Sequence, residues 1–159
     1  MNSLRVYLSG PMGGLTVKKA CAWRTEATKQ LAKFSISVLN PMRDEYDSEQ
    51  EIISTNYRDF KDRGLFFTTK SIAARDFNDV KLADCLLINF LGTKTASLGT
   101  IVELAWAYAL QKPAVIVIEA EGNPHDNHPL LHECMPFRAQ TLAEGVKAVA
   151  LILGMEKND

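Results

Sequence analysis

Short apolar segments alternate along this chain with longer amphipathic ones, and the alternation restricts the possible folds more than any other feature. The apolar segments are rich in Val, Ile and Leu and have the length of buried strands; they cover residues 4–8, 36–40, 85–90 and 114–119. The longer segments show the apolar periodicity of helices and cover residues 17–33, about 72–83, 100–111 and 141–153. Parallel neighbouring strands need crossover connections, which are normally right-handed helices, so this order predicts a parallel sheet.

We therefore expect an α/β protein with a flavodoxin- or Rossmann-like, doubly wound, mostly parallel sheet of about five strands and helices on both faces. A chain of 159 residues is suited to a single domain over residues 1–159. Residues 41–71 interrupt the alternation with a polar stretch that carries aromatic residues. This insertion predicts a short helix and a loop over one end of the sheet, because long insertions of this kind are often lids or binding loops.

Charge and composition exclude several kinds of partner. Eighteen basic and nineteen acidic residues give a net charge of -1, which favours neither a nucleic-acid polymer nor an anionic membrane. The apolar runs are far shorter than the ~20 residues that span a bilayer, and the first residues lack the pattern of a secretory signal. We expect a cytoplasmic protein. Cys21, Cys85 and Cys134 form neither a disulfide framework nor a CxxC metal motif.

In folds of this class, ligands bind beyond the carboxyl ends of the strands. Three segments should meet there: "GPMGG" (10–14), "LGTKTAS" (91–97) and the loop after 114–119. The next helix, in "SLGTIVELAWAYAL" (97–110), carries Glu103 among apolar neighbours. Two explanations are open for this carboxylate: a capping box in which Thr100 caps the helix and Glu103 reaches back to the backbone, or a catalytic role.

Three motifs occur in one order: "VYLSGPMGG", "RDFNDVKLADCLLINF" and "SLGTIVELAWAYALQKPAVIVI". In these motifs the chain resembles the nucleoside 2-deoxyribosyltransferase family, including its 2′-deoxynucleoside 5′-monophosphate N-glycosidase branch. The resemblance covers roughly residues 4–119 and leaves the insertion at 41–71 unmatched. It implies covalent, retaining cleavage of the bond between sugar and base, with no cofactor and no metal.

The resemblance also implies roles for individual residues. Glu103 matches the nucleophile that attacks C1′ of the deoxyribose, Asp76 matches the residue that handles the proton of the departing base, and Tyr7 matches the tyrosine that orients the nucleophile. Asp79 is the alternative acid. Without the resemblance, Asp76 is equally well explained as a solvated helix residue and Tyr7 as a core tyrosine.

The chemistry explains why two carboxyl groups are needed. Breaking an N-glycosidic bond builds positive charge on the sugar, which an ionised carboxylate stabilises and traps, while a protonated carboxyl group assists departure of the base. We expect the helix N-terminus to favour the ionised form of Glu103, whereas Asp76 needs surroundings that raise its pKa.

Ser97 bears on the substrate. In the family, transferases acting on free nucleosides carry Asp six residues before the nucleophile, whereas the monophosphate-cleaving branch carries Ser. A Ser97 hydroxyl, the Gly99 amide and a helix N-terminus can all donate to a 5′-phosphate; the alternative is that Ser97 only caps the helix. Ser9 and Gly10 are expected to line the sugar pocket or to form an ordinary turn, and Asn89 to contact the base or to end its strand.

The histidines admit two interpretations. His125, His128 and His132, with Glu133, suggest a metal cluster, but Pro124 and Pro129 oppose a regular helix that would present them together. In relatives, the segment after the fourth strand enters the site of a neighbouring subunit. The resemblance therefore implies that Asn127 and His128 complete a pocket across the interface of a homodimer or larger homo-oligomer.

Taken together, these features predict cleavage of the N-glycosidic bond of 2′-deoxynucleoside 5′-monophosphates or nucleosides, by hydrolysis or by deoxyribosyl transfer to another base. One alternative is a nucleotide-binding sensor of the same fold that performs no chemistry. Another is a base-releasing enzyme that acts on ribonucleotides. Base preference is open, because the helix reads "ELAWA" where many relatives have Gly after the Glu-Leu pair.

Overall fold

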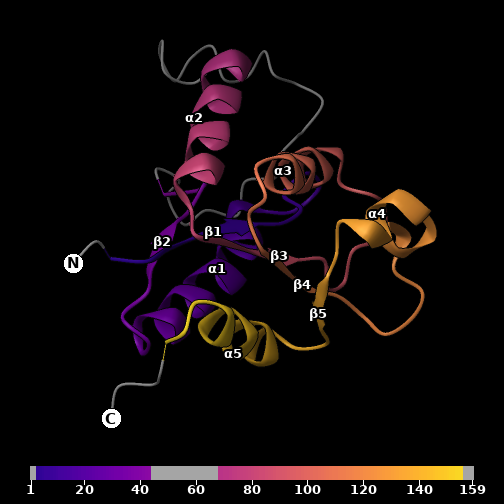
Figure 1. Cartoon of the computed structure of the whole chain (residues 1–159). Helices are drawn as coiled ribbons and strands as arrows, with labels where there is room; N and C mark the ends of the chain where they lie inside the picture. The colour runs from indigo at the N-terminus through magenta and orange to yellow at the C-terminus, as the bar shows by residue number, and fades with distance from the viewer. Residues whose placement is uncertain (1–2, 44–67, 156–159) are drawn as a thin grey trace.

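The computed structural model describes residues 3–43 and 68–155, and its sheet contains five strands in the order β2-β1-β3-β4-β5, all parallel (Figure 1). The expected α/β class is confirmed. In chain order the elements are β1 (Arg5–Ser9), α1 (Val17–Ala32), β2 (Ser37–Leu39), α2 (Thr69–Leu82), β3 (Cys85–Asn89), α3 (Leu98–Ala109), β4 (Ala114–Val117), the 3-10 helix η3 (Pro124–Asn127), α4 (Pro129–Glu133), β5 (Phe137–Ala139) and α5 (Leu142–Ile152).

The sheet separates two cores, because successive side chains of a strand point to opposite faces. Helices α1 and α5 cover one face and α2 and α3 cover the other (Figure 1). In β1, Val6 and Leu8 pack in the core under α1 and α5, whereas Tyr7 packs in the core under α2 and α3. Residues 7 and 9 of β1 are therefore the ones that can reach α3.

The strand order reverses at β1: β2 lies on one side of β1, and β3, followed by β4 and β5, lies on the other. The helix after β1 covers one face, and the helix after β3 covers the other. In doubly wound sheets, a crevice opens at such a point beyond the carboxyl ends of the strands. Ser9 and Asn89 end the two strands there, so the predicted ligand edge lies at this point of the topology.

Side-chain caps fix the starts of α1, α2 and α5. The Thr16 and Thr68 hydroxyls accept from the backbone of Lys19 and Ser71, and Thr141 forms a capping box with Glu144. Because Thr68 caps α2, this helix begins at Thr69, and residues 69–71 belong to it rather than to the predicted insertion. Residues 44–67 of the predicted insertion lie outside the described residues.

Sequence periodicity alone did not place β5, η3 or α4. The helices η3 and α4 have four and five residues, which is too short for a helical period to be counted. In β5 two of the three residues are exposed, so this strand lacks the apolar run that marked the other strands. Pro124 and Pro129 sit at the starts of η3 and α4, where proline is tolerated, and the two short helices meet at His128. None of the described helices combines the length and the apolar character that crossing a membrane requires.

Gly145 allows α5 to lie close against the sheet. A β-carbon at this position would lie 2.5 Å from Cγ2 of Val117 and 3.2 Å from Cδ1 of Leu87. Overpacking by this methyl group should cost about 1–3 kcal/mol, whereas the higher helix propensity of Ala should return roughly 1 kcal/mol. We predict that the first effect is the larger and that Gly145→Ala lowers the free energy of unfolding. Urea unfolding measures this change.

The control is a double-mutant cycle with Val117→Ala, which removes the methyl groups that the new β-carbon would meet. The two substitutions should couple favourably by about 1 kcal/mol or more. A Gly145→Ala variant that is more stable than wild type would contradict this account of the packing.

Candidate active site

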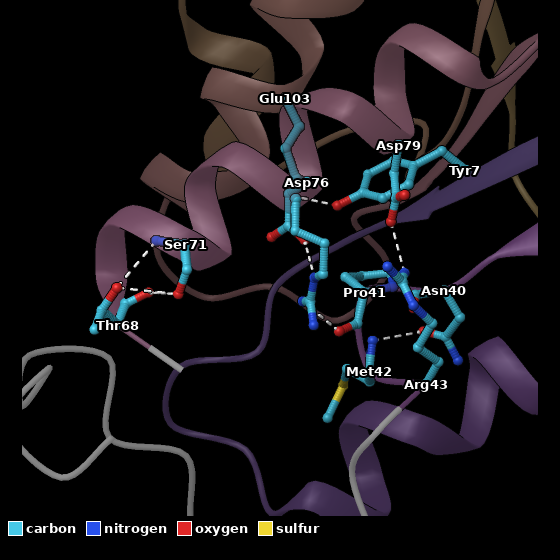
Figure 2. A network of polar contacts seen from close by, with 11 residues as sticks. Tyr7, Asn40, Pro41, Met42, Arg43, Thr68, Ser71, Asp76, Asp79 and Glu103 are labelled. Carbon is cyan, nitrogen blue, oxygen red and sulfur yellow. Dashed lines mark hydrogen bonds and ion pairs between the residues drawn. The ribbon is translucent and has the colours of Figure 1, made fainter. Parts of the chain in front are cut away.

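Glu103 is buried on α3 and is held by β1, as Figure 2 shows for its contact with Tyr7. The Tyr7 hydroxyl donates to Oε1 at 2.7 Å, and the Ser9 hydroxyl donates to Oε2. These donors occupy alternate positions of one strand and point to the same face. The capping-box explanation is wrong, because Ser97 is the N-cap of α3, Thr100 lies within the helix, and the Glu103 carboxylate bonds to the sheet instead of to its own backbone.

Burial raises the pKa of Glu103 to about 7, while hydrogen bonds from Ser9 and Tyr7 oppose the rise. Asp76 raises this pKa further, and the positive charge of Arg24 lowers it. The expectation that the helix N-terminus favours the ionised form is not met, because Glu103 lies six residues after the N-cap and the effect of a helix end is confined to about one turn. The hydroxyl groups of Tyr7 and Ser9 favour the ionised form instead, because they donate hydrogen bonds to the carboxylate.

Asp76 is the second buried carboxylate near this position (Figure 2). It lies on α2, 7% exposed, and interacts electrostatically with both Glu103 and Tyr7. Burial raises its pKa, while Arg75, whose Nε lies 3.0 Å from Oδ1, opposes the rise. Asp76 is therefore not a solvated helix residue.

Asp79, the alternative acid, has a different partner. Arg43 donates to Oδ2 of Asp79 at 2.6 Å and also to the carbonyl oxygen of Asn40 at 3.0 Å. Arg75 reaches the same segment, donating to the carbonyl oxygen of Pro41 at 2.7 Å. The two arginines tie the chain after β2 to α2, so Asp79 serves this attachment.

Tyr7 is fully buried, and its pKa is raised well above the usual value, first by burial and then by the negative charge of Glu103. Its hydroxyl therefore keeps its proton at neutral pH and remains a donor to the carboxylate. Tyr7 is at once a core residue and a hydrogen-bond donor to Glu103.

The family assignment follows from a comparison of the whole sequence. The nucleoside 2-deoxyribosyltransferase family model matches residues 6–135, which include every residue of the cluster just described. The chain belongs to this family. No curated protein sequence matches the chain.

Solved structures share the fold at low sequence identity. A 2-deoxyribosyltransferase from Bacillus psychrosaccharolyticus is similar with a TM-score of 0.60 and 16% identity, over 98% of this chain and 99% of that one. The CMP N-glycosidase BcmB from Clostridium botulinum gives 0.57 and 15%, over 93% and 98%. The Moco carrier protein of Chlamydomonas rheinhardtii gives 0.59 and 17%, over 97% and 99%. Identities this low establish the fold alone.

Ser97 and Gly99 form the start of α3 in this deoxyribosyltransferase-family chain. Ser97 is the N-cap by position, but its hydroxyl makes no capping bond and instead lies 2.9 Å from the Thr100 hydroxyl. Gly99 is exposed, and a β-carbon there would meet nothing within 4 Å. The start of α3 thus borders open space, as a ligand contact would require.

Gly10 serves packing rather than an unusual backbone angle. A β-carbon would lie 2.9 Å from the carbonyl oxygen of Asn89 and 3.0 Å from the ring of Trp23. Within 10–14, the positive φ occurs at Gly14, not at Gly10. Asn89 accepts a hydrogen bond from the Leu91 amide through Oδ1, which ends β3 as the alternative explanation expected.

Sequence reasoning missed Arg24, which is fully buried in α1. Its guanidinium donates to the carbonyl oxygens of Gly10 at 2.8 Å and Ala20 at 2.6 Å and lies 4.6 Å from the centre of the Trp23 ring. Burial lowers its pKa to about 10, so it stays charged at neutral pH. The signal was available, because residues 20, 24, 27 and 31 share the buried stripe of the helix.

In the segment after β4, some polar residues are exposed and others contact one another or the start of α3. Asn127 and His128 are exposed at the junction of η3 and α4. His132 contacts Asp126, which also pairs with Arg138 at 2.6 Å. Among the described residues, no three His, Cys, Asp or Glu side chains are grouped to hold a metal. His125 is buried and contacts the backbone of Ser97, which sequence reasoning also missed.

Burying the Glu103 carboxyl group has a pH-dependent cost. Its pKa is higher in the folded protein than the ordinary value of 4.5, so the native state binds more protons, and stability falls as pH rises from about 4.5 to about 7. A shift of this size corresponds to about 3 kcal/mol. We predict that Glu103→Gln gains stability relative to wild type over this range, with the full gain above pH 7.

Urea unfolding of both proteins at pH 4, 6 and 8 measures the difference. The matched control is Glu133→Gln, because Glu133 is an exposed carboxylate whose removal should leave the pH dependence of wild type in place. A stability difference between Glu103→Gln and wild type that does not change with pH would show that the carboxylate is not buried as described.

Proposed function

We propose that this protein cleaves the N-glycosidic bond of 2′-deoxynucleoside 5′-monophosphates, by hydrolysis or by deoxyribosyl transfer to another base. The observation that carries the proposal is the buried Glu103 carboxylate, held by two hydroxyls of β1 with a second buried carboxyl group nearby. Buried carboxyl groups with raised pKa values cluster at functional sites, because a protein has little structural reason to bear their desolvation. Membership of the deoxyribosyltransferase family supports the same chemistry.

In the first step, an oxygen of ionised Glu103 forms a bond to C1′ while the bond from C1′ to the base nitrogen breaks. The electron pair of that bond leaves with the base, and Asp76 supplies the proton that the base takes up. Water or a second base then attacks C1′ and releases the glutamate. The two half-reactions need Asp76 first as an acid and then as a base, and its raised pKa supports the first role.

Ser97 and the start of α3 support a phosphorylated substrate. A hydroxyl at position 97 can donate to a phosphate oxygen, whereas a carboxylate would repel it. The exposed Gly99 leaves the backbone of the first turn accessible, and helix N-termini attract anions. Ser9 bonds to Glu103, so we assign it to holding the nucleophile rather than to lining the sugar pocket.

Two alternatives keep specific support. The fold is shared with the CMP N-glycosidase BcmB, which supports a base-releasing enzyme acting on ribonucleotides. It is also shared with a Moco carrier protein, which supports a binding protein without chemistry. The buried pair of carboxyl groups favours chemistry over binding, because binding a ligand without reaction gives no reason to bury two carboxyl groups at the cost of their hydration.

A substrate panel tests the proposal directly. The protein is incubated with each deoxynucleoside, its 5′-monophosphate and the matching ribonucleotide, with and without an acceptor base, and free base is measured by chromatography. We expect base release from deoxynucleoside monophosphates, and a loss of at least about 10³-fold in Glu103→Gln with ligand binding retained. Binding without base release from any substrate would establish the sensor alternative instead.

Ser97→Asp tests the phosphate contact. The new carboxylate should repel the 5′-phosphate, so kcat/KM for monophosphates should fall about tenfold or more beyond any fall for the unphosphorylated nucleosides. Ser97→Asn, which has a similar size and no charge, is the matched control and should show a much smaller difference between the two substrates. Equal losses on both substrates in Ser97→Asp would remove the argument for a phosphate.

We also propose that the protein forms a homodimer or larger homo-oligomer, with Asn127 and His128 near the site of a neighbouring subunit. Support comes from α3, whose exposed residues include no charged side chain: Leu98, Gly99, Val102, Ala105, Tyr108 and Ala109. An outward helix face of this kind is typical of an interface rather than of a solvated surface. Phe77 of α2 packs edge-on against Trp106 and extends this apolar face.

Ala105→Glu tests the association. A charge in the middle of the α3 face should convert the oligomer to monomer in analytical ultracentrifugation, while Ala143→Glu, at an exposed alanine of α5 on the opposite side of the sheet, should leave the mass unchanged. Wild type that sediments as a monomer, or an Ala105→Glu variant with the wild-type mass, would contradict the proposed interface.

A further inference from the structure

His125 is fully buried and has both ring nitrogens in hydrogen bonds. Nε2 lies 2.8 Å from the Ser97 amide, which donates to it, and Nδ1 lies 2.8 Å from Oδ1 of Asn123. The ring stacks on Phe90 at 3.7 Å between centroids and 18° between planes. The imidazole therefore has a fixed position against the backbone of Ser97, the N-cap of α3.

The surrounding bonds determine which ring nitrogen carries the proton. The Asn123 amide nitrogen donates to the Phe90 carbonyl oxygen at 2.9 Å and to the Glu119 carboxylate at 2.7 Å. Oδ1 of Asn123 is thus left to accept, from the His125 amide and from Nδ1–H. With its proton on Nδ1, the neutral ring presents a lone pair at Nε2 to the Ser97 amide.

These contacts join the carboxyl end of β4 to the start of α3. Glu119 also accepts from the Gly92 amide at 2.6 Å. Two hydrogen bonds therefore join the loop after β3 to the segment after β4: Gly92 to Glu119, and Ser97 to His125. Burial lowers the pKa of His125, which keeps the ring neutral and able to accept. Ser97 has no side-chain capping bond of its own; its amide is held by the bond to His125, and its carbonyl oxygen accepts from the Ile101 amide at 3.0 Å.

We propose that His125 is a positioning residue for the substrate's 5′ group: by accepting from the Ser97 amide, it holds the Ser97 hydroxyl and the first turn of α3 in the arrangement that receives a phosphate. This inference rests on the proposed function, because it assigns the start of α3 to the 5′ side of the substrate. The ring nitrogens of His125 bond to the Ser97 amide and to Asn123, not to Glu103 or Asp76, so its effect is on binding of the 5′ group and not on the bond-breaking step.

Two variants separate this role from general packing. His125→Phe keeps a ring to stack on Phe90 but has no acceptor, whereas His125→Gln places a carbonyl oxygen where it can accept from Ser97. We expect His125→Phe to raise KM for deoxynucleoside monophosphates about tenfold, with kcat and the KM for unphosphorylated nucleosides changed less than threefold. His125→Gln should restore KM to within about threefold of wild type. A tenfold change corresponds to about 1.4 kcal/mol, the order expected for one hydrogen bond.

A readout independent of activity uses ¹⁵N NMR of the same proteins. Wild type should show Nδ1 protonated and Nε2 unprotonated at pH 7, and added inorganic phosphate should shift the Ser97–Thr100 amide signals in wild type and His125→Gln more than in His125→Phe. If wild type releases no base, the proposed function fails, and these NMR data still decide the role of His125. If wild type is active but His125→Phe affects both substrates equally, or His125→Gln restores nothing, the positioning role is overturned and the proposed function stands.

Discussion

The hydrogen bonds from β1 to the buried carboxylate of Glu103 are the interaction on which the rest of the site depends. Desolvation of a carboxyl group is unfavourable, and its cost appears as a pKa raised to about 7. Tyr7 and Ser9 offset part of that cost because they occupy alternate positions on one face of the strand. A slip of β1 by one residue would present Val6 and Leu8 to α3 instead. The geometry of the site therefore depends on the register of this strand.

Arginines organise the surroundings of the two carboxyl groups. Arg24, Arg43 and Arg75 come from α1, the turn after β2 and α2, and each donates to at least one backbone carbonyl oxygen near the site. Arg24 donates to the carbonyl oxygen of Gly10, the residue after Ser9, and Arg75 forms an ion pair with Asp76. Guanidinium groups suit this task because they bond in several directions from one plane and stay charged when buried. The positive charge lowers the pKa of both carboxyl groups against the effect of burial.

Short apolar runs predicted β1, β2, β3 and β4, helical periodicity predicted the four longer helices, and the order of these elements predicted the parallel sheet. Resemblance, rather than periodicity, selected Glu103, Asp76 and Tyr7, which the fold brings together from three elements. The start of α3 could not be predicted locally, since Ser97 and Thr100 are both suitable N-caps, and they are distinguished by tertiary contacts: that of Ser97 with His125 and those of Glu103 with β1. His125 itself was inaccessible to pattern reasoning, because its partner lies 28 residues earlier in the chain.

The central claim is that an oxygen of Glu103 bonds to the sugar. Acid quenching during turnover of a deoxynucleoside 5′-monophosphate, followed by proteolysis and mass spectrometry, tests it most directly. The account predicts a deoxyribose 5-phosphate adduct on the peptide that contains Glu103, present in wild type and absent in Glu103→Gln. Base release with no adduct at any time, or an adduct on a different residue, would contradict it.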